Sequence, residues 1–399
     1  MKSDIRIYLA VCLSFTSLLG QGTYDINDVN LSTPELIMKY GYPVEIHEIT
    51  TEDGYILTMY RIPHGKGGSG VNKKPYLLMH GMFGQAENFI VAGIHDGSLA
   101  YMLADNDFDV WLGNTRGNQH GRRHVTLNPK QRAFWNFSFH EMGMYDLPAK
   151  IDYILNVTNQ DKLFYTGHSQ GGTIFYIMSS LKPEYQQKIA LASLLAPGGF
   201  ENHFTNPMLT PLASRHKELT QLAATLNIFE LPPRGIRLSE LLMAACGNAL
   251  FRDLCIIVYH ISTGGDPSEF NKEIFPLLLN FLPSASTKQV LHYGQLVASG
   301  HFRPWDYGTT KKNIEFYGEA LPPDYPIRNI TVPVAMYYSL GDNLAFAKDI
   351  ENICDAMQNC VRKFLIPNKR WTHMDFVTST NLKKQCNEPL LKFAQKYNL

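Results

Sequence analysis

The run GHSQG at residues 167–171 constrains this chain more than any other segment. It follows an apolar, strand-like stretch at 163–165 and precedes a helix-like stretch at 171–181. A serine between two glycines, on a sharp turn from a strand to a helix, exposes its hydroxyl at the edge of a sheet. The glycines leave room for a strained backbone at the serine. We therefore predict that Ser169 is a catalytic nucleophile carried by a sheet.

The surrounding chain alternates between strand-like and helix-like segments. The strand-like segments are short apolar runs at 76–79, 109–112, 163–165, 190–195, 332–338 and 363–366. The helix-like segments are longer and amphipathic, at 88–104, 144–156, 171–181 and 347–357. Such alternation is typical of a mostly parallel sheet with helices on both faces. We expect an α/β fold whose core comprises residues 23–199 and 322–399.

The alternation stops between residues 200 and 321. That segment has no clear series of strands and contains clustered apolar helical stretches, at 238–251 and 274–281. We interpret residues 200–321 as a helical cap inserted into the core. We expect the apolar surface of this cap to take part in binding; the alternative is an ordinary buried helical core, which would have the same pattern.

A serine hydroxyl becomes a strong nucleophile only when a histidine accepts its proton and an acid orients that histidine. In α/β sheets of this kind the chain order is serine, acid, histidine. Asp342 follows the strand-like run 332–338, and His373 follows the last run at 363–366. Both therefore reach the carboxyl edge of the sheet, where ligands bind. We predict that Asp342 is the acid and His373 the general base.

Three other residues compete for these roles. Asp349 lies inside a helix-like run, and Asp324 lies in a proline-rich loop, so neither is placed as well as Asp342. His168 is adjacent to Ser169, but neighbouring side chains on a tight turn point apart. We interpret His168 as a packing residue. For Asp342 the alternative role is a cap on the helix that follows it.

Hydrolysis by a serine also needs two backbone amides that bind the developing oxyanion. The first is the amide after the nucleophile, that of Gln170. The run MHGMFG at residues 79–84, directly after an apolar strand, resembles the His-Gly loop that supplies the second. We assign that second amide to Met82; the alternative is a plain glycine-rich turn.

Composition excludes two classes of protein. Lys and Arg number 36 and Asp and Glu number 36, so the chain has no basic excess with which to bind nucleic acid. Apolar residues make up 45% and aromatic residues 12%, which is too much for a disordered chain. The 14 histidines would make the protein positive in an acidic compartment.

The first residues indicate export. Lys2 and Arg6 border an apolar run at 7–19, and small residues follow at 20–22. We predict a signal peptide at residues 1–22, because the apolar run is shorter than the roughly 20 residues that span a bilayer. No later segment is predicted to cross a membrane. The mature protein is expected to be secreted or lysosomal.

Cysteines and glycosylation sequons agree with export. Five cysteines follow the signal segment, and two close pairs, 246/255 and 354/360, could each close a local loop. We expect at least one disulfide, with Cys246–Cys255 as the candidate pair; the alternative is buried thiols. The candidate glycosylation sites are the asparagines of four N-x-S/T sequons, Asn30, Asn136, Asn156 and Asn329.

Two other segments resemble known binding motifs but lack the neighbouring residues or secondary structure that those motifs require. The run GKGGSG at residues 65–70 fits G-x-G-x-x-G, but it precedes a strand instead of joining a strand to a helix. His140 and Glu141 are followed by Met144 where a zinc protease has histidine. We expect no cofactor and no metal.

These residues resemble the animal acid lipases, the family of gastric lipase and lysosomal acid lipase. The resemblance covers nearly the whole mature chain and is carried by several motifs. They are TEDGYIL at 51–57, LMHG at 78–81, DVWLGNTRG at 109–117, FSFHEM at 137–142, YDLPA at 145–149, GHSQG at 167–171 and HMDF at 373–376.

The resemblance implies an α/β-hydrolase that hydrolyses triacylglycerols or cholesteryl esters at a lipid–water interface. It also implies a cap with a mobile lid, glycosylation, and tolerance of acid. Carried over by motif, the nucleophile is Ser169, the acid Asp342 and the base His373. The oxyanion amides are those of Met82 and Gln170.

Some features depart from the family pattern. Met82 stands where the family usually has leucine, and the cap matches poorly outside residues 246–251. Of the properties that the resemblance implies, substrate preference is therefore the one it predicts least well. Two alternatives remain: a carboxylesterase or thioesterase for short soluble esters, and a non-catalytic lipid-binding relative. Nothing in the sequence predicts an oligomeric state.

Overall fold

The computed structural model describes residues 26–68, 73–92, 97–233, 238–247, 249–263 and 267–397. The predicted signal peptide at 1–22 and part of the glycine-rich run at 65–70 lie outside the described residues. No helix among the described residues is long and apolar enough to cross a membrane.

One large sheet forms the centre of the molecule, with strands in the order β1-β2-β4-β3-β6-β7-β10-β11 and with β5 paired to β2. From β4 to β11 all neighbours are parallel, whereas β1, β2 and β5 join antiparallel. The strands are β1 Glu45–Thr50, β2 Tyr55–Ile62, β3 Lys74–Met79, β4 Phe108–Gly113, β5 Arg123–His124, β6 Leu163–His168, β7 Ile189–Leu195, β10 Val334–Tyr338 and β11 Cys360–Leu365. The predicted mostly parallel α/β sheet is confirmed.

Burial explains which strands the sequence reveals. Every residue of β4, β6 and β10 is buried, because helices cover both faces of the sheet. These strands appear in the sequence as continuous apolar runs. Strand β1 at the edge instead alternates, with only His47 and Ile49 buried. Such a strand is not an apolar run, and neither β1 nor β2 is among the strands predicted from the sequence.

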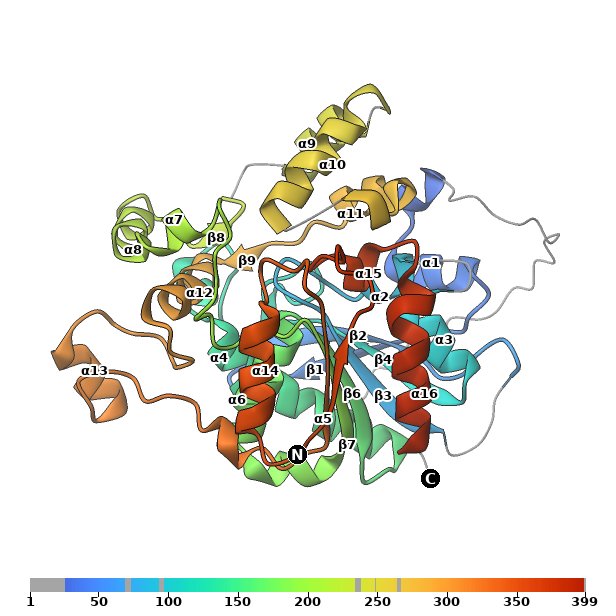
Figure 1. The fold of residues 1–399 in the computed structure, drawn as a ribbon, viewed down its shortest axis with the longest axis horizontal. Helices are drawn as coiled ribbons and strands as arrows, with labels where there is room; N and C mark the ends of the chain where they lie inside the picture. The colour runs from blue at the N-terminus through green and yellow to red at the C-terminus, as the bar shows by residue number, and fades with distance from the viewer. Residues whose placement is uncertain are drawn as a thin grey trace.

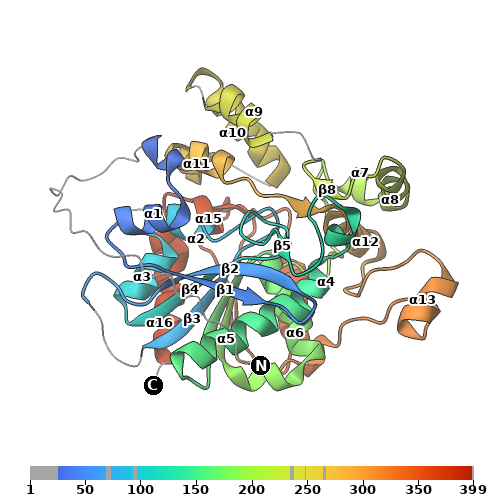
Figure 2. The same ribbon diagram turned by 180° about the vertical axis from the view of Figure 1, so that it is seen from behind.

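Helices cover both faces of the sheet. Figure 1 and Figure 2 show α3 and α16 on one face and α5 and α6 on the other. The α-helices outside the cap are α1 Thr33–Lys39, α2 Asn88–Val91, α3 Leu99–Asp105, α4 Phe139–Glu141, α5 Leu147–Thr158, α6 Gln170–Leu181, α14 Ala347–Ala356, α15 Asp375–Thr378 and α16 Glu388–Lys396. Short 3-10 helices are η1 Ile26–Asn30, η2 Arg132–Trp135, η4 Pro183–Lys188, η5 Pro267–Glu269, η6 Lys272–Ile274 and η7 Ile327–Asn329, and π-helical turns are η3 Met142–Asp146 and η8 Lys383–Asn387.

Two predicted helices differ from the structure. The stretch 88–104 forms two helices, α2 and α3, with residues 93–96 outside the described residues. The stretch 144–156 begins as the π-helical turn η3 and becomes α-helical only at Leu147. Gly143 in this turn packs so closely on α6 that a Cβ there would lie 2.8 Å from Ile177 Cβ. Amphipathic periodicity carries no sign of such interruptions.

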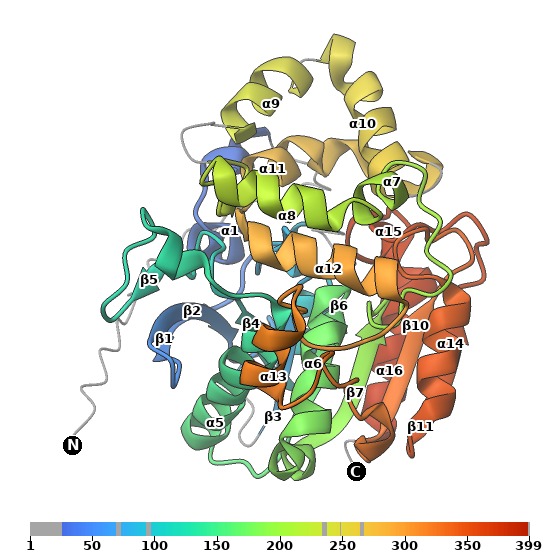
Figure 3. The same ribbon diagram turned by 90° about the vertical axis from the view of Figure 1, so that its left-hand side faces the viewer.

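Most of the segment between β7 and β10 forms a layer of helices above the sheet, whereas α13 lies lower and to the side, as Figure 1 and Figure 3 show. Its elements are α7 Thr210–Ala213, α8 His216–Thr225, β8 Glu230–Leu231, α9 Leu238–Cys246, α10 Ala249–Thr263, α11 Phe275–Asn280, β9 Ala285–Ser286, α12 Thr287–Ser299 and α13 Thr310–Tyr317. Leu277, Leu296 and Phe302 belong to the main hydrophobic core, which ties the lower cap helices to the sheet.

The outer cap has a small core of its own. It contains Cys246, Ile256, Phe270, Phe275 and Leu279 and lies beneath α9 and α10. A disulfide joins Cys246 to Cys255 and so connects these two helices, and a second joins Cys354 to Cys360 between α14 and β11. Cys386 is a buried free thiol. We keep residues 200–321 as the proposed cap.

A buried ion network fixes the loops beside β4. Arg116 is 1% exposed, and its guanidinium donates to Asp146 Oδ1 at 2.7 Å and to Asp53 Oδ1 at 2.8 Å. Its Cζ also lies 4.0 Å from the ring centre of Tyr55. Asp53 lies in the turn between β1 and β2, and Asp146 precedes α5, so one side chain connects three segments.

We predict that Arg116→Ala lowers the free energy of unfolding by about 3–5 kcal/mol, because it leaves two carboxylates without their buried cation. The matched control is Arg123→Ala, which removes an exposed ion pair with Glu48 and should cost less than about 1 kcal/mol. Urea denaturation of both variants measures the difference. Equal losses in the two variants would contradict the structural role of Arg116.

Candidate active site

Ser169 lies on the turn between β6 and α6 and adopts a backbone conformation with positive φ, at φ 53° and ψ −116°. This conformation is costly for a residue with a side chain. It is held by the Ser169 amide, which donates to Leu195 O at 2.9 Å, and by the Ser169 carbonyl, which accepts from Gly172 N at 2.8 Å. The serine is partly exposed. The turn predicted from GHSQG is therefore present in its strained form.

Glycines around the turn are required by close backbone packing. A Cβ on Gly167 would lie 2.4 Å from the carbonyl carbon of Gly171. A Cβ on Gly171 would lie 2.4 Å from the carbonyl oxygen of Met79 on β3, and one on Gly172 would lie 2.4 Å from Pro197 Cβ. Any side chain at these positions would push α6 away from the sheet and displace the serine.

Asp342 and His373 form a buried pair. His373 Nδ1 lies 2.9 Å from Asp342 Oδ2, and the two residues are 5% and 3% exposed. The other carboxylate oxygen of Asp342 accepts from the amides of Leu344 at 2.8 Å and Ala345 at 2.9 Å. Asp342 thus closes its own turn and does not cap α14, which begins at Ala347.

The loops that carry these two residues touch through their backbones. Gly341 approaches the base loop so closely that a Cβ would lie 2.6 Å from Trp371 O. Ser339 Oγ donates to that same carbonyl oxygen at 2.8 Å. Within the base loop, Asp375 Oδ2 accepts from Thr372 N at 2.6 Å. These contacts hold the loops of Asp342 and His373 together independently of the hydrogen bond between the two side chains.

The competing acids pair with other histidines. Asp349 on α14 accepts from the backbone amide of His203 at 2.9 Å and lies 2.7 Å from His203 Nδ1. Asp324 lies 2.9 Å from His301 Nδ1 at an exposed site. Neither contacts His373. The structure therefore brings Asp342, and neither rival, to His373.

His168 does more than fill space. It is buried, its ring centre lies 5.0 Å from that of His373, and its Nε2 lies 3.0 Å from the carbonyl oxygen of His373. Burial, with the nearby His373, lowers the pKa of His168 to about 3. The ring is therefore neutral above acidic pH, so its Nε2–H donates to that carbonyl. His168 holds the backbone of the base loop.

The loop after β3 lies directly against the nucleophile. A Cβ on Gly81 would lie 2.9 Å from Ser169 Cβ, so only glycine allows this approach. His80 shapes the loop: its Nδ1 bonds to Gly81 O at 2.8 Å, and its Nε2 accepts from Thr115 N at 3.3 Å. Burial lowers the pKa of His80 to about 4, which keeps this arrangement of one donor and one acceptor. Met82 follows at the tip of the turn.

Gln170 is the first residue of α6, where backbone amides have no partner within the helix. Its side chain is fixed on both sides: Oε1 accepts from Gln289 Nε2 at 2.6 Å, and Nε2 lies 3.4 Å from Met142 Sδ. Gln289 belongs to cap helix α12. The cap thus contacts the residue that follows the nucleophile.

Glu201 is a buried carboxyl close to the acid loop. It is 5% exposed, its Oε1 accepts from Gly199 N at 3.3 Å, and its Oε2 has no hydrogen-bond partner among the described residues. Burial first, and then the charge of Asp349 and of Asp342, raise the pKa of Glu201 well above its ordinary 4.5. The carboxyl is therefore protonated over a wide pH range.

Sequence reasoning did not identify three of these residues. Glu201 and Gln289 lie in the segment interpreted as cap, and no local motif marks either one. His168 was identified only as a packing residue. Within the described part of the chain, no group of three or more histidine, cysteine, aspartate or glutamate side chains is arranged to hold a metal ion.

Two sequence families match the chain by their models. A partial alpha/beta-hydrolase lipase region matches residues 33–93, and the alpha/beta hydrolase fold matches residues 74–228. Among solved structures, a soluble variant of monoglyceride lipase from Saccharomyces cerevisiae superposes with a TM-score of 0.53. It covers 88% of this chain and 96% of its own at 15% identity, which supports the fold alone. The architecture is that of an α/β-hydrolase.

Relatives with higher sequence identity narrow the class of α/β-hydrolase to the lipases. Lipase 1 of Drosophila melanogaster is 40% identical over 92% of this chain and 81% of its own length. Gastric triacylglycerol lipase of Rattus norvegicus is 35% identical, with coverage of 92% and 93%. Lysosomal acid lipase/cholesteryl ester hydrolase of Homo sapiens is 33% identical, with 98% of both chains covered. The chain belongs to the animal acid lipase family.

The protonated state of Glu201 predicts a pH-dependent gain from Glu201→Gln. The unfolded chain loses its Glu201 proton above about pH 4.5, while the folded chain keeps it, so wild-type stability falls as pH rises toward the raised pKa of the folded state. The side-chain amide of glutamine does not ionise, so the variant does not lose stability in this way as pH rises. The free energy of unfolding of Glu201→Gln, relative to wild type, should therefore increase with pH by up to about 1.4 kcal/mol per unit.

Urea denaturation at intervals from pH 4.5 to 7.5 measures this difference. Glu319→Gln, at an exposed position, is the matched control and should follow wild type at every pH. A constant difference between Glu201→Gln and wild type across the range would show that Glu201 ionises normally in the folded protein.

Proposed function

We propose that this protein hydrolyses the carboxylic ester bonds of neutral lipids, triacylglycerols or cholesteryl esters or both, at a lipid–water interface. The observation that carries the proposal is the buried Asp342–His373 pair, at 2.9 Å, in a sheet whose neighbouring turn presents Ser169 in a strained conformation. The family to which the chain belongs supports the same chemistry.

The tautomer of His373 follows from its partner. In the proposed arrangement Asp342 Oδ2 accepts from Nδ1–H of His373, which leaves Nε2 to act as the base. In the proposed first half-reaction, His373 takes the proton of Ser169 as its oxygen attacks the ester carbonyl. His373 then gives that proton to the departing alcohol. Water attacks the acyl-enzyme in the second half-reaction and releases the fatty acid.

The oxyanion of each tetrahedral intermediate is assigned to the amides of Met82 and Gln170. Gln170 begins α6, so the positive end of the helix dipole supports the same charge. Gly81 brings the loop containing Met82 against Ser169. Since a backbone amide supplies the hydrogen bond, methionine in place of the family's leucine changes the shape of the pocket more than the chemistry.

An exposed apolar face on α10 supports action at an interface. Phe251, Leu254, Val258 and Ile261 are spaced by three, four and three residues, so they share one face of the helix, and each is more than half exposed. Leu241 on α9 is 60% exposed. Contiguous apolar surface of this kind is rare on a soluble protein and typically marks a contact with protein or lipid. Figure 3 shows α9 and α10 as the outermost layer of the cap.

Substrate class and location are extended from the relatives. One relative is named for triacylglycerols and another for cholesteryl esters, and the two disulfides and four exposed sequon asparagines of this chain support secretion or a lysosomal location. Preference between the two lipid classes would be set by the cap. Hydrolysis of emulsified triacylglycerol and cholesteryl ester, measured from pH 4 to 8, would separate them.

We predict that Ser169→Ala and Asp342→Asn each yield a folded protein with kcat reduced by about 10⁴-fold or more, because each removes a member of the catalytic set. The matched control is Asp324→Asn, which alters the exposed Asp324–His301 pair and should retain wild-type turnover. Hydrolysis of a dissolved chromogenic short-chain ester measures all three variants. Wild-type turnover in Ser169→Ala would rule out the assigned nucleophile.

We also predict that Val258→Asp lowers activity on emulsified long-chain triacylglycerol at least about tenfold while leaving activity on a dissolved short-chain ester unchanged. A charged side chain at the bilayer centre costs about 2.5–3.5 kcal/mol, and this cost falls toward the interface. Val125→Asp, at a similarly exposed valine outside the cap, is the control. If both substrates respond equally to Val258→Asp, or if wild type prefers the soluble ester, the protein is an esterase and not an interfacial lipase.

A further inference from the structure

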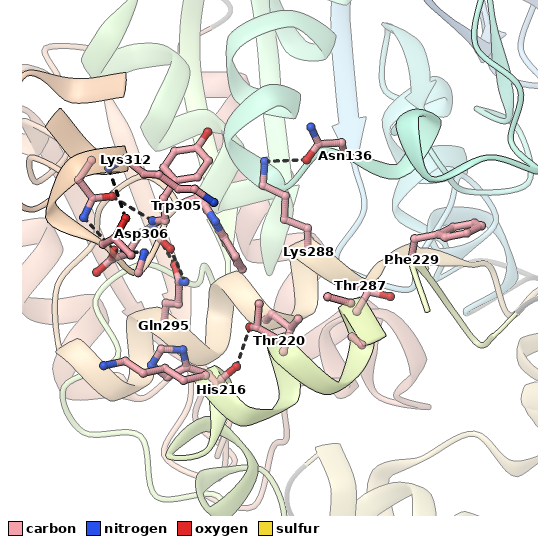
Figure 4. Close-up of a pocket in the computed structure, with 18 of the residues that line it drawn as sticks. Asn136, His216, Thr220, Phe229, Thr287, Lys288, Gln295, Trp305, Asp306 and Lys312 are labelled. Atoms are coloured by element: carbon pink, nitrogen blue, oxygen red, sulfur yellow. Dashed lines mark hydrogen bonds between the residues drawn. The ribbon is translucent and has the colours of Figure 1, made fainter. Parts of the chain in front are cut away.

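The cap meets the rest of the molecule in different ways on its two sides. Between α8, α12 and α13 lies a cavity of about 670 Å³, shown in Figure 4, and none of Ser169, Asp342 and His373 lines it. The chain that follows α10 instead lies against the segment that carries the proposed base. Figure 1 and Figure 3 show α15, which begins just after His373, beneath the outer cap helices.

Two backbone hydrogen bonds join the chain after α10 to the end of α15. Asn271 N donates to Thr378 O at 3.1 Å. Thr380 N donates to Glu269 O at 2.9 Å. Between these bonds lies Phe270, which is 4% exposed and belongs to the small core of the outer cap. The outer cap is therefore fixed in register against the chain that follows the base.

The side chain of Glu269 binds both ends of the base-bearing segment, residues 368–381. Its Oε1 accepts from Asn368 Nδ2 at 2.9 Å, and its Oε2 accepts from Asn381 Nδ2 at 2.8 Å. Asn368 follows β11 and Asn381 follows α15, so the two asparagines lie on either side of His373 in the chain. We call this arrangement of Glu269, Asn368 and Asn381 the Glu269 clamp.

Asn368 can offer only its NH₂ group to Glu269. Its Oδ1 already accepts from Arg370 N at 3.0 Å. Turning the amide over would lose that bond and would place an oxygen against the carboxylate, which is also an acceptor. The carboxylate and this amide are therefore complementary in one orientation.

The middle of the base-bearing segment is held from the side of the sheet. Ser339 Oγ donates to Trp371 O, and His168 Nε2 bonds to the carbonyl oxygen of His373. The Glu269 clamp adds contacts at both ends of the segment from the side of the cap. The position of the base therefore depends on the cap as well as on the sheet.

We propose that Glu269 is a positioning residue for His373, and that the outer cap sets the placement of the base through the Glu269 clamp. This inference rests on the proposed function, in which His373 is the base. Glu269 also follows α10, whose exposed apolar face supports action at an interface. A shift of α10 at a lipid surface would therefore reach His373 through the clamp.

An exchange of the two partners tests the clamp. Asn368→Asp places a second carboxylate against Glu269, which separates the two segments. We expect kcat on a dissolved short-chain ester to fall about tenfold or more at unchanged KM, because a misplacement of about 1 Å can cost about 100-fold. Adding Glu269→Gln to Asn368→Asp exchanges the carboxylate and the amide, since the new Nε2 donates to residue 368 and Oε1 accepts from Asn381. The double variant should recover most of the wild-type kcat.

Hydrogen–deuterium exchange, followed by mass spectrometry, reports on the clamp without ester hydrolysis. Peptides from residues 368–381 should exchange faster in Asn368→Asp than in wild type, and at the wild-type rate in the double variant. Glu273→Gln, at an exposed glutamate of the same cap segment, is the matched control and should match wild type in both measurements. Glu269→Ala removes the clamp without adding a charge and should lower kcat too, so the test holds even if Asn368→Asp does not fold.

Three results would overturn the proposal: wild-type kcat in Glu269→Ala and Asn368→Asp, a double variant as impaired as Asn368→Asp, or unchanged exchange in residues 368–381. A lower free energy of unfolding at unchanged kcat would assign Glu269 a purely structural role and would overturn it as well. Failure of the wild-type protein to hydrolyse either a soluble or an emulsified ester would count against the proposed function, whereas the exchange measurement counts for or against the clamp alone.

Discussion

The steric constraint at the junction of β6 and α6 governs the rest of the molecule. Ser169 can keep its positive φ only because α6 begins almost in contact with β3 and with the end of β7. Gly171 meets the carbonyl of Met79, and Gly172 meets Pro197, at distances that admit no side chain. The same closeness brings the loop after β3 to the serine, so the strained turn and the proposed amide pair are consequences of a single packing arrangement.

The acid and the base depend on a second close approach. Gly341 lets the loop after β10 touch the loop after β11, and the hydroxyl of Ser339 joins them through Trp371 O. His168 connects this pair of loops to the nucleophile turn, because its neutral ring bonds to the backbone of His373. Three loops from three strands are thereby held by backbone contacts. The backbone contacts between the loops therefore place Asp342 and His373 at hydrogen-bonding distance, and the attraction between the two side chains is not needed to bring them together.

Much of this arrangement could be predicted, for one physical reason. Parallel strands end at the same edge of a sheet, so residues that follow apolar runs, such as Ser169, Asp342 and His373, must lie near one another. The fold class followed from the same alternation. Their catalytic roles, and those of the Met82 and Gln170 amides, stay predictions that mutagenesis has to test.

Other features could not be predicted, because their causes are tertiary. The pKa of Glu201 is raised because the folded chain buries its carboxyl and brings the charges of Asp349 and Asp342, which are distant in sequence, close to it. Gln289 meets Gln170 across 119 residues of sequence. Strand β1 was not predicted, because an edge strand exposes every second side chain and so does not form an apolar run. The π-helical turn η3 follows from its packing against α6, which amphipathic periodicity does not encode.

The bond between Gln289 and Gln170 has a mechanical consequence. Helix α12 is hydrogen-bonded to Gln170 through Gln289 and contributes Leu296 to the main core. An outward movement of α12 would therefore break the Gln289–Gln170 hydrogen bond. Helices α9 and α10 instead rest on a small separate core, with a disulfide binding one to the other. If the cap opens toward lipid, a movement of α9 and α10 would leave the contact between Gln289 and Gln170 in place, whereas a movement of α12 would break it.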